Sequence, residues 1–98
     1  MDNIYSTLFG IFMGEENRGE VVGRDEVNGY TIDTCYTIDQ GWETAVWYED
    51  YPMIIVARYP DKEMATQGHK EWVETCTTNR PTHAISVQTD RIESFMEE

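Results

Sequence analysis

Apolar and polar side chains alternate along residues 30–39, and this is the clearest pattern in the chain. One face of the segment carries Tyr30, Ile32, Tyr36 and Ile38, while threonine, aspartate and cysteine side chains dominate the other face. A period of two residues is typical of a β-strand that is buried on one side. We therefore predict a strand here whose first face belongs to the hydrophobic core.

The turn before this strand is indicated by the pair Asn28-Gly29, which suits a two-residue type I′ hairpin turn. A turn of this type places Val27 opposite the first residue of the strand, and Arg24 opposite Asp33. The latter two side chains carry opposite charges, so we expect a cross-strand ion pair. The part of the chain from residue 20 onward should therefore begin with a β-hairpin.

The turn after the strand decides which residues of the next strand face the core. A two-residue loop would place Glu43 opposite Ile38, whereas a three-residue loop over residues 39–41 would pair Trp42 with Ile38. The three-residue loop also gives its glycine the left-handed position that this type of turn requires. We predict the three-residue loop, which sets Trp42 and Val46 on the core face.

Residues 53–59 form a nearly unbroken apolar run that is rich in β-branched side chains and has the length of a strand. Such a run indicates burial on both faces. A four-residue turn before it would place Tyr59 beside Trp42 and Ile55 beside Val46. Both faces of the sheet therefore need a cover. The apolar side chains left for the second face are Cys35, Ala45, Trp47, Ile54 and Val56.

One cover is an amphipathic helix, predicted to start at Pro60-Asp61 and to end near residues 77–79. Asn79 is able to take a left-handed cap conformation, and Pro81 cannot continue the helix. This helix should pack its apolar stripe against one face of the sheet. The stripe consists of Ala65, His69, Trp72, Val73 and Cys76.

The two ends of the chain have weaker patterns. Residues 1–19 are expected to form an N-terminal arm, in which helical and strand spacings compete and which ends in a polar loop over residues 14–19. This arm is the simplest cover for the second sheet face, and another molecule is the alternative. Residues 83–88 alternate weakly and leave room for a short last strand. Residues 90–98 are expected to be a frayed helical turn or disordered.

These elements predict an α+β fold: an antiparallel meander of about four strands, then one amphipathic helix and a short C-terminal strand. Residues 20–98 should form one domain, because 98 residues with 40% apolar side chains suffice for a single core. The formal net charge of -12 changes the functional picture. The few lysine and arginine residues are scattered, so direct binding of nucleic acid and binding to an anionic membrane surface are both disfavoured.

Histidine and cysteine residues are sparse, and their spacing predicts no cofactor or metal site. Cys35, His69, Cys76 and His83 are at least seven positions apart, whereas structural zinc sites use closely spaced ligand pairs. We expect free, buried thiols in a reducing cytosol, and no secretory signal is recognisable. His69 lies on the apolar stripe of the helix and is expected to be a histidine at the edge of the core that donates one hydrogen bond.

Carboxylates are the remaining candidates for chemistry. Glu43 with Asp33 and Asp39 would share one sheet face, where such a group could bind a cation or act as acid and base. With 19 acidic residues in the chain, chance proximity is expected, and no catalytic motif accompanies them. We therefore expect a protein without enzymatic activity.

A dense group of aromatic residues between residues 42 and 72 supplies anchors of the kind that protein interfaces use. The second sheet face and the acidic turn before the fourth strand are the predicted binding surface. Its partner should be a protein with a basic surface. The predicted partner-binding residues are Glu43, Trp47, Glu49, Asp50, Tyr51 and Ile54.

Three segments carry a resemblance: Glu43-Thr44-Ala45-Val46-Trp47, Ile54-Ile55-Val56-Ala57-Arg58-Tyr59 and Gly68-His69-Lys70-Glu71-Trp72. Over residues 28–88 the chain resembles small uncharacterised proteins encoded by tailed bacteriophages and prophages. The resemblance implies a phage accessory or virion product in the bacterial cytoplasm, and it implies no known chemistry.

Two functions follow from these observations. The first is a non-enzymatic, acidic protein-binding module, such as a phage-encoded inhibitor of a host defence or nucleic-acid enzyme, acting in the cytoplasm of the bacterial host. The second is a structural component of a phage virion whose N-terminal arm mediates assembly. A homodimer formed through an edge strand is a further expectation, which the net charge opposes.

Overall fold

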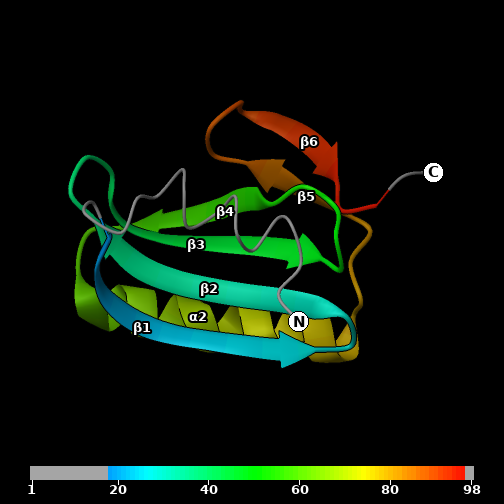
Figure 1. The fold of residues 1–98 in the computed structure, drawn as a ribbon, viewed down its shortest axis with the longest axis horizontal. Coiled ribbons are helices and arrows are strands. Elements are labelled where there is room, and N and C mark those ends of the chain that lie inside the picture. The colour runs from blue at the N-terminus through cyan, green and yellow to red at the C-terminus, as the bar shows by residue number, and fades with distance from the viewer. Residues whose placement is uncertain (1–17, 97–98) are drawn as a thin grey trace.

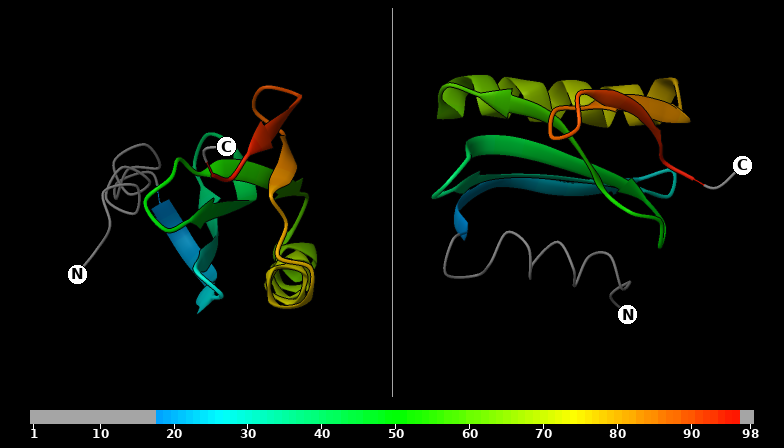
Figure 2. Two further views of the ribbon diagram at one scale, coloured as in Figure 1. Left: turned by 90° about the vertical axis from the view of Figure 1, so that its right-hand side faces the viewer. Right: turned by 90° about the horizontal axis from the view of Figure 1, so that it is seen from above.

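The structure, a computed structural model, describes residues 18–96. Its elements in chain order are β1 (Arg18–Val27), β2 (Tyr30–Thr37), β3 (Gly41–Tyr48), β4 (Ile54–Tyr59), α2 (Lys62–Thr78), β5 (His83–Ser86) and β6 (Arg91–Ser94). Strands β1 to β4 form an antiparallel meander in that order, and β5 pairs with β6 in a separate hairpin (Figure 1). Helix α2 lies across one face of the meander, and the hairpin packs beside β4 (Figure 2). The predicted α+β class is confirmed.

The start of β1 corrects one boundary. Arg18 and Gly19 belong to β1 rather than to the predicted polar loop, because the strand pairs with β2 from Arg18 onward. The rest of the predicted N-terminal arm, and its suggested role as cover for the second sheet face, lie outside the described residues.

The turn between β1 and β2 has the predicted geometry. Asn28 and Gly29 both have positive φ angles, 53° and 89°, as a type I′ turn requires. Val27 faces Tyr30 and Arg24 faces Asp33, with 3.8 Å between a guanidinium nitrogen and a carboxylate oxygen. The predicted hairpin and its ion pair are therefore confirmed.

The side chain of Asn28 also ties this turn to the end of the helix. Its amide nitrogen donates to the backbone carbonyls of Cys76 (3.3 Å) and Thr77 (3.1 Å). Its carbonyl oxygen accepts from Arg80 at 3.3 Å. Helix α2 leaves its last carbonyls without partners inside the helix, and Asn28 satisfies two of them from 48 and 49 positions away.

The turn between β2 and β3 is a three-residue loop, but it lies one position earlier than predicted. Thr37 pairs with Gly41 and Tyr36 pairs with Trp42, so the predicted pair of Trp42 with Ile38 is wrong. The Thr37 hydroxyl donates to the carbonyl of Gly41 and accepts from the amide of Gln40, which closes the turn at this position. The predicted left-handed glycine is correct, with a φ of 77° at Gly41. The face assignments in β3 survive, because the pairing moves by two positions in total.

The pairing of β3 with β4 contains an irregularity that the sequence pattern did not reveal. Tyr59 lies opposite Trp42 as predicted, but the register shifts after Thr44, and Val46 then pairs with Ile54 rather than Ile55. An extra residue in one strand reverses the faces of everything beyond it. Ile54 therefore lies on the helix side of the sheet and Ile55 on the opposite side.

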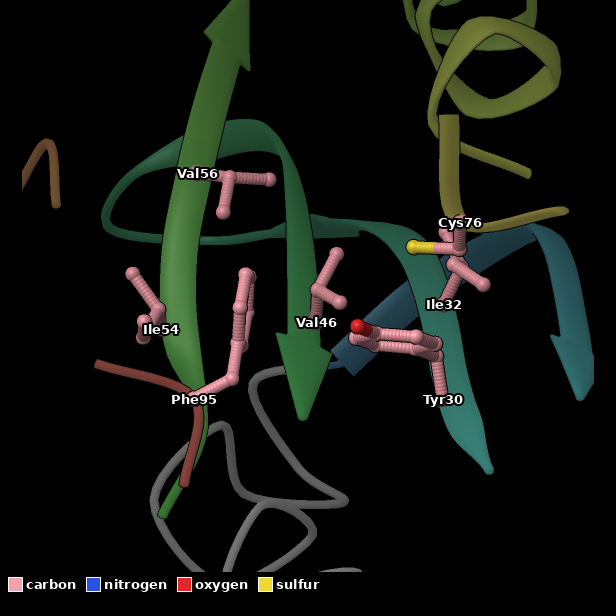
Figure 3. Close-up of a cluster of buried hydrophobic side chains, with 7 residues drawn as sticks. All are labelled: Tyr30, Ile32, Val46, Ile54, Val56, Cys76 and Phe95. Carbon is pink, nitrogen blue, oxygen red and sulfur yellow. The ribbon is translucent and has the colours of Figure 1, made fainter. Parts of the chain in front are cut away.

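This shift corrects the assignment of both sheet faces. Ile54 and Val56 belong to the buried cluster under the helix and not, as predicted, to the face of Trp47. The second face holds a smaller buried cluster in which Ile55 replaces them. The main core, drawn in Figure 3, consists of Tyr30, Ile32, Val46, Ile54, Val56, Cys76 and Phe95. The second cluster consists of Cys35, Ala45, Trp47 and Ile55.

Helix α2 begins and ends close to the predicted positions. Asp61 is the N-cap, and its carboxylate accepts from the amide of Met64 at 2.8 Å. The prediction of a left-handed cap at Asn79 is wrong, because Asn79 remains in the right-handed region and Arg80 takes the positive φ of 46°. Pro81 follows directly and excludes any further helical turn.

The C-terminal segment is more ordered than predicted. The predicted last strand is β5, but the expected frayed or disordered tail forms a second strand, β6, that pairs with it. Phe95 then enters the main core fully buried, with its ring centre 5.8 Å from that of Tyr30 (Figure 3). Burying this large aromatic ring, with Met96 packed beside it against the same core, stabilises the segment.

Candidate functional site

The six predicted partner-binding residues fall into two groups. Glu43, Trp47 and Ile54 are buried, whereas Glu49 and Asp50 are exposed and Tyr51 is half-buried. A buried side chain offers little surface to a partner in this state of the protein. The role of the buried group in binding stays a prediction, while the exposed group lies together in the turn between β3 and β4.

This turn is held in one conformation by backbone and ring contacts. The amide of Glu49 donates to the carbonyl of Gly29 at 2.9 Å, and the amide of Tyr51 donates to Tyr48 at 3.0 Å. The rings of Tyr51 and Tyr48 stack with centres 6.4 Å apart and planes 21° apart. Glu49 has a φ of 47°, an uncommon conformation for a non-glycine residue. The acidic turn is therefore anchored to the tip of the first hairpin.

The acidic turn and the end of β6 together border a hollow of about 690 Å³. Carboxylates lie on one side of it, and on the other side lie residues that follow or end β6. The Ser94 hydroxyl accepts from the amide of Met96 and has one proton to donate, either to the carbonyl of Met96 or to that of Thr82; these contacts hold the second wall in place. The lining residues are Glu49, Asp50, Tyr51, Pro52, Ser94, Phe95 and Met96.

Sequence analysis identified only the first wall of this hollow. Residues 94–96 were missed because they lie in a short, charged segment that was expected to lack structure. The one signal was Phe95, a large apolar residue in a polar tail, since such a residue tends to be buried. The hollow can accept a side chain that is both extended and cationic, because it combines carboxylates with aromatic and thioether surface.

A second constellation lies between the sheet and the helix, with Thr34, Thr44 and His69 buried and Asp25 exposed at one end. His69 contacts the carboxylate of Asp25 through Nε2 at 2.6 Å and the hydroxyl of Thr34 through Nδ1 at 2.7 Å. The Thr34 hydroxyl lies 2.6 Å from that of Thr44, which lies 3.0 Å from the phenol oxygen of Tyr59. We call this set of five residues the relay. His69 thus has one hydrogen-bond partner on each ring nitrogen, and the predicted donation of one hydrogen bond is compatible with this arrangement.

Two glycines make room for the relay. A β-carbon at Gly23 would lie 2.7 Å from Nε2 of His69, and one at Gly68 would lie 2.3 Å from the Tyr59 ring. Asp25, His69 and Thr34 match the residue types of a hydrolase triad, but Thr34 is fully buried and hydrogen-bonded to Thr44. The Thr34 hydroxyl is therefore not exposed to solvent in this structure.

The carboxylates on the second sheet face are paired with arginines. Glu43 accepts from Arg58 at 3.0 Å, and Asp33 pairs with Arg24, whose guanidinium lies 5.5 Å from the Trp47 ring centre. Burial raises the pKa of Glu43, although the hydrogen bond and charge of Arg58 lower it. Of the predicted group, Glu43 and Asp33 each pair with an arginine, and the charge of Asp39 raises the pKa of Glu43 further.

The cysteine and histidine residues that were weighed as zinc ligands do not converge. Cys35 lies in the second cluster and Cys76 in the main core, on opposite faces of the sheet, and both are free thiols. Burial raises the pKa of Cys76 to about 11, which keeps its thiol protonated. Within residues 18–96, no group of three or more His, Cys, Asp and Glu side chains is placed to hold a metal ion.

Comparison with known proteins leaves the site to be interpreted from its own geometry. No family model, curated protein or solved structure matches this chain. Helix α2 is too polar and too short to cross a bilayer. None of the described residues forms a helix with the length and apolar character that a membrane span needs.

Proposed function

We propose that this protein is a non-enzymatic binding module that grips a cationic side chain of a partner protein in the hollow beside the acidic turn. The observation that carries the proposal is the joining of exposed carboxylates with Tyr51 and Met96 around one concave surface. A lysine or arginine side chain fits this chemistry, because its stem packs on apolar atoms while its charge meets the carboxylates.

The net charge supports a partner with a basic surface. A formal charge of -12 produces a negative potential that speeds the approach of a positively charged protein and weakens with salt. The acidic turn then supplies the specific contact at the end of that approach. The proposed binding surface is thus smaller than the six residues predicted from sequence, and it centres on Glu49, Asp50 and Tyr51.

The proposed class of target is an enzyme whose own ligand is negatively charged. Host defence enzymes and nucleic-acid enzymes present basic grooves, and an acidic protein that occupies such a groove acts as an inhibitor. The resemblance to phage and prophage proteins over residues 28–88 motivates the choice of a bacterial host. The alternative virion role depends on the N-terminal arm, which lies outside the described residues.

A charge-reversal experiment tests the site. The purified protein is immobilised, bacterial lysate is passed over it at low and high salt, and the captured protein is then purified to measure its affinity. Asp50→Arg should weaken the affinity at least tenfold, which corresponds to about 1.4 kcal/mol. Glu74→Arg changes the net charge equally at an exposed position of α2 and should weaken the affinity much less.

Two results would contradict the proposal. An affinity that is the same at low and high salt would remove the electrostatic mechanism. Equal losses in Asp50→Arg and Glu74→Arg would show that overall charge, and not the hollow, determines binding.

A further inference from the structure

The relay crosses the whole sheet beneath the helix. It starts at Asp25 on β1, passes through His69 on α2, Thr34 on β2 and Thr44 on β3, and ends at Tyr59 on β4. Each of the five main elements contributes one residue (Figure 1). Four consecutive contacts of 2.6–3.0 Å connect the two edges of the meander.

Counting protons gives the relay a direction when His69 is neutral. An ionised carboxylate only accepts hydrogen bonds, so Asp25 requires a proton on Nε2 of His69. A neutral imidazole has one proton, so Nδ1 must accept, and the Thr34 hydroxyl must donate to it. Thr34 then accepts from Thr44, and Thr44 accepts from Tyr59. All four donors are used, and each points towards Asp25.

A second proton on His69 would reverse this order. An imidazolium donates from both nitrogens, so Nδ1 would donate to Thr34. The Thr34 hydroxyl must then donate to Thr44, and Thr44 must donate to Tyr59. One proton is added at Nδ1 and three hydroxyl groups rotate about their C–O bonds, while no other bond forms or breaks. The phenol proton of Tyr59 turns away from the relay.

The charged surroundings are compatible with both states. The described contact between His69 and a charged group is with Asp25 on β1, whose side chain is 55% exposed, while β2 and β3 contribute only hydroxyls. At the other end, burial raises the pKa of Tyr59, the bond to Thr44 lowers it, and the charge of Glu71 on α2 raises it. The phenol therefore keeps its proton in both states; it donates to Thr44 in the first state and accepts from Thr44 in the second.

We propose that the relay is a two-state switch in which the proton state of His69 at one edge of the sheet sets the hydroxyl direction of Tyr59 at the other edge. Imidazole is the side chain that most readily changes charge near neutral pH, so pH is the variable with which the switch is tested. The relay is independent of the proposed binding hollow, and it would stand if the hollow bound nothing.

Nuclear magnetic resonance of the wild-type chain tests the direction of the relay. Long-range ¹H–¹⁵N spectra distinguish the two neutral tautomers of an imidazole. His69 should carry its proton on Nε2, and His83, the other histidine of the chain, gives a reference in the same spectrum. A proton on Nδ1 of neutral His69 would overturn the proposal. This measurement needs no variant, so a folding defect cannot obscure it.

The coupling between the two ends needs a second measurement. The ¹³Cζ shift of Tyr59 should change at the same pH midpoint as the ring nitrogens of His69. Thr44→Val removes the middle hydroxyl. In this variant the ¹³Cζ shift of Tyr59 should no longer change at the midpoint of His69, while the ring-nitrogen shifts of His69 should still change with pH. Thr31→Val, a buried β2 position on the opposite sheet face, should leave the coupling intact. Persistence of the coupling in Thr44→Val, or its loss in Thr31→Val, would overturn the switch.

Discussion

The main core and the relay share one sheet face and one helix, but they are built on different physical principles. The main core gathers apolar side chains from β2, β3, β4 and α2, together with Phe95, which follows β6 (Figure 3). The relay uses five polar side chains, each with a defined partner. Apolar packing depends mainly on volume and tolerates exchanges of similar shape. A buried hydrogen-bond network requires every member to keep its partner.

The difference also appears in the space that each region demands. The relay lies against the backbone at Gly23 and Gly68, where any larger residue would meet an imidazole or a phenol ring. These two positions lie at the edge of the meander and inside the helix, where glycine is otherwise unfavourable. The glycines that make room for the relay thus lower local stability, and the packing of the main core must offset this loss.

The largest effect is expected from opening the main core. Phe95→Ala should lower the free energy of unfolding by about 3–5 kcal/mol, because it removes a fully buried ring and leaves a cavity. Urea denaturation would measure this change. Ile92→Ala is a suitable control, since Ile92 is 72% exposed on the neighbouring strand and should change stability by about 0.5 kcal/mol or less. Similar losses in both variants would show that the hairpin, and not the ring, carries the effect.

A smaller effect is expected from crowding the relay. Alanine in place of glycine inside a helix normally stabilises it by about 1 kcal/mol. Gly68→Ala should instead lower the free energy of unfolding by about 1–3 kcal/mol, because the new β-carbon would lie 2.3 Å from the Tyr59 phenol. A double-mutant cycle with Tyr59→Ala measures the cause. Gly68→Ala should no longer destabilise the protein in that background, and an unchanged loss would contradict the explanation.

The smallest effect concerns the ion pair between Glu43 and Arg58 on the second sheet face. Burial raises the pKa of Glu43 above its ordinary 4.5, so the folded protein holds this proton more tightly than the unfolded chain. The stabilising contribution of Glu43 is complete below that ordinary value and is lost as the pH rises through the raised pKa. Glu43→Gln cannot titrate, so the wild type should lose stability relative to it over this range. Unfolding followed at several pH values would measure the difference, and a difference independent of pH would refute the assignment.

Local patterns predicted the parts of the fold that depend on neighbouring residues. The burial of Tyr30 and Ile32, the Asn28-Gly29 turn and the stripe on α2 each reflect a period or a backbone requirement visible within a few positions. The alternation was wrong for the other two residues of the predicted core face, because Tyr36 is 38% exposed and Ile38, which lies beyond the end of β2, is 65% exposed. The shift between β3 and β4 was missed because every residue from Ile54 to Val56 is apolar, so no alternation marks where the faces reverse. The strand β6 was missed because its stability comes from burying Phe95 against residues distant in sequence.

The sites were predicted less completely for the same reason. The acidic turn was found because charge and turn residues are local, but its opposite wall comes from residues more than forty positions later. His69 was correctly placed at the edge of the core, whereas its partner Asp25 lies 44 positions earlier and carries no distinguishing signal. Contacts of this kind depend on the register of the whole sheet, which a single unrecognised bulge already alters.

The double role of Asn28 has a consequence for protein engineering. Tips of β-hairpins are common choices for grafting a peptide epitope or a reporter, because many of them contact only solvent. Here the tip side chain holds the carbonyls of Cys76 and Thr77, so an insertion would loosen the helix end together with the hairpin. The turn at residues 38–40 has exposed side chains and is the better place to graft foreign sequence.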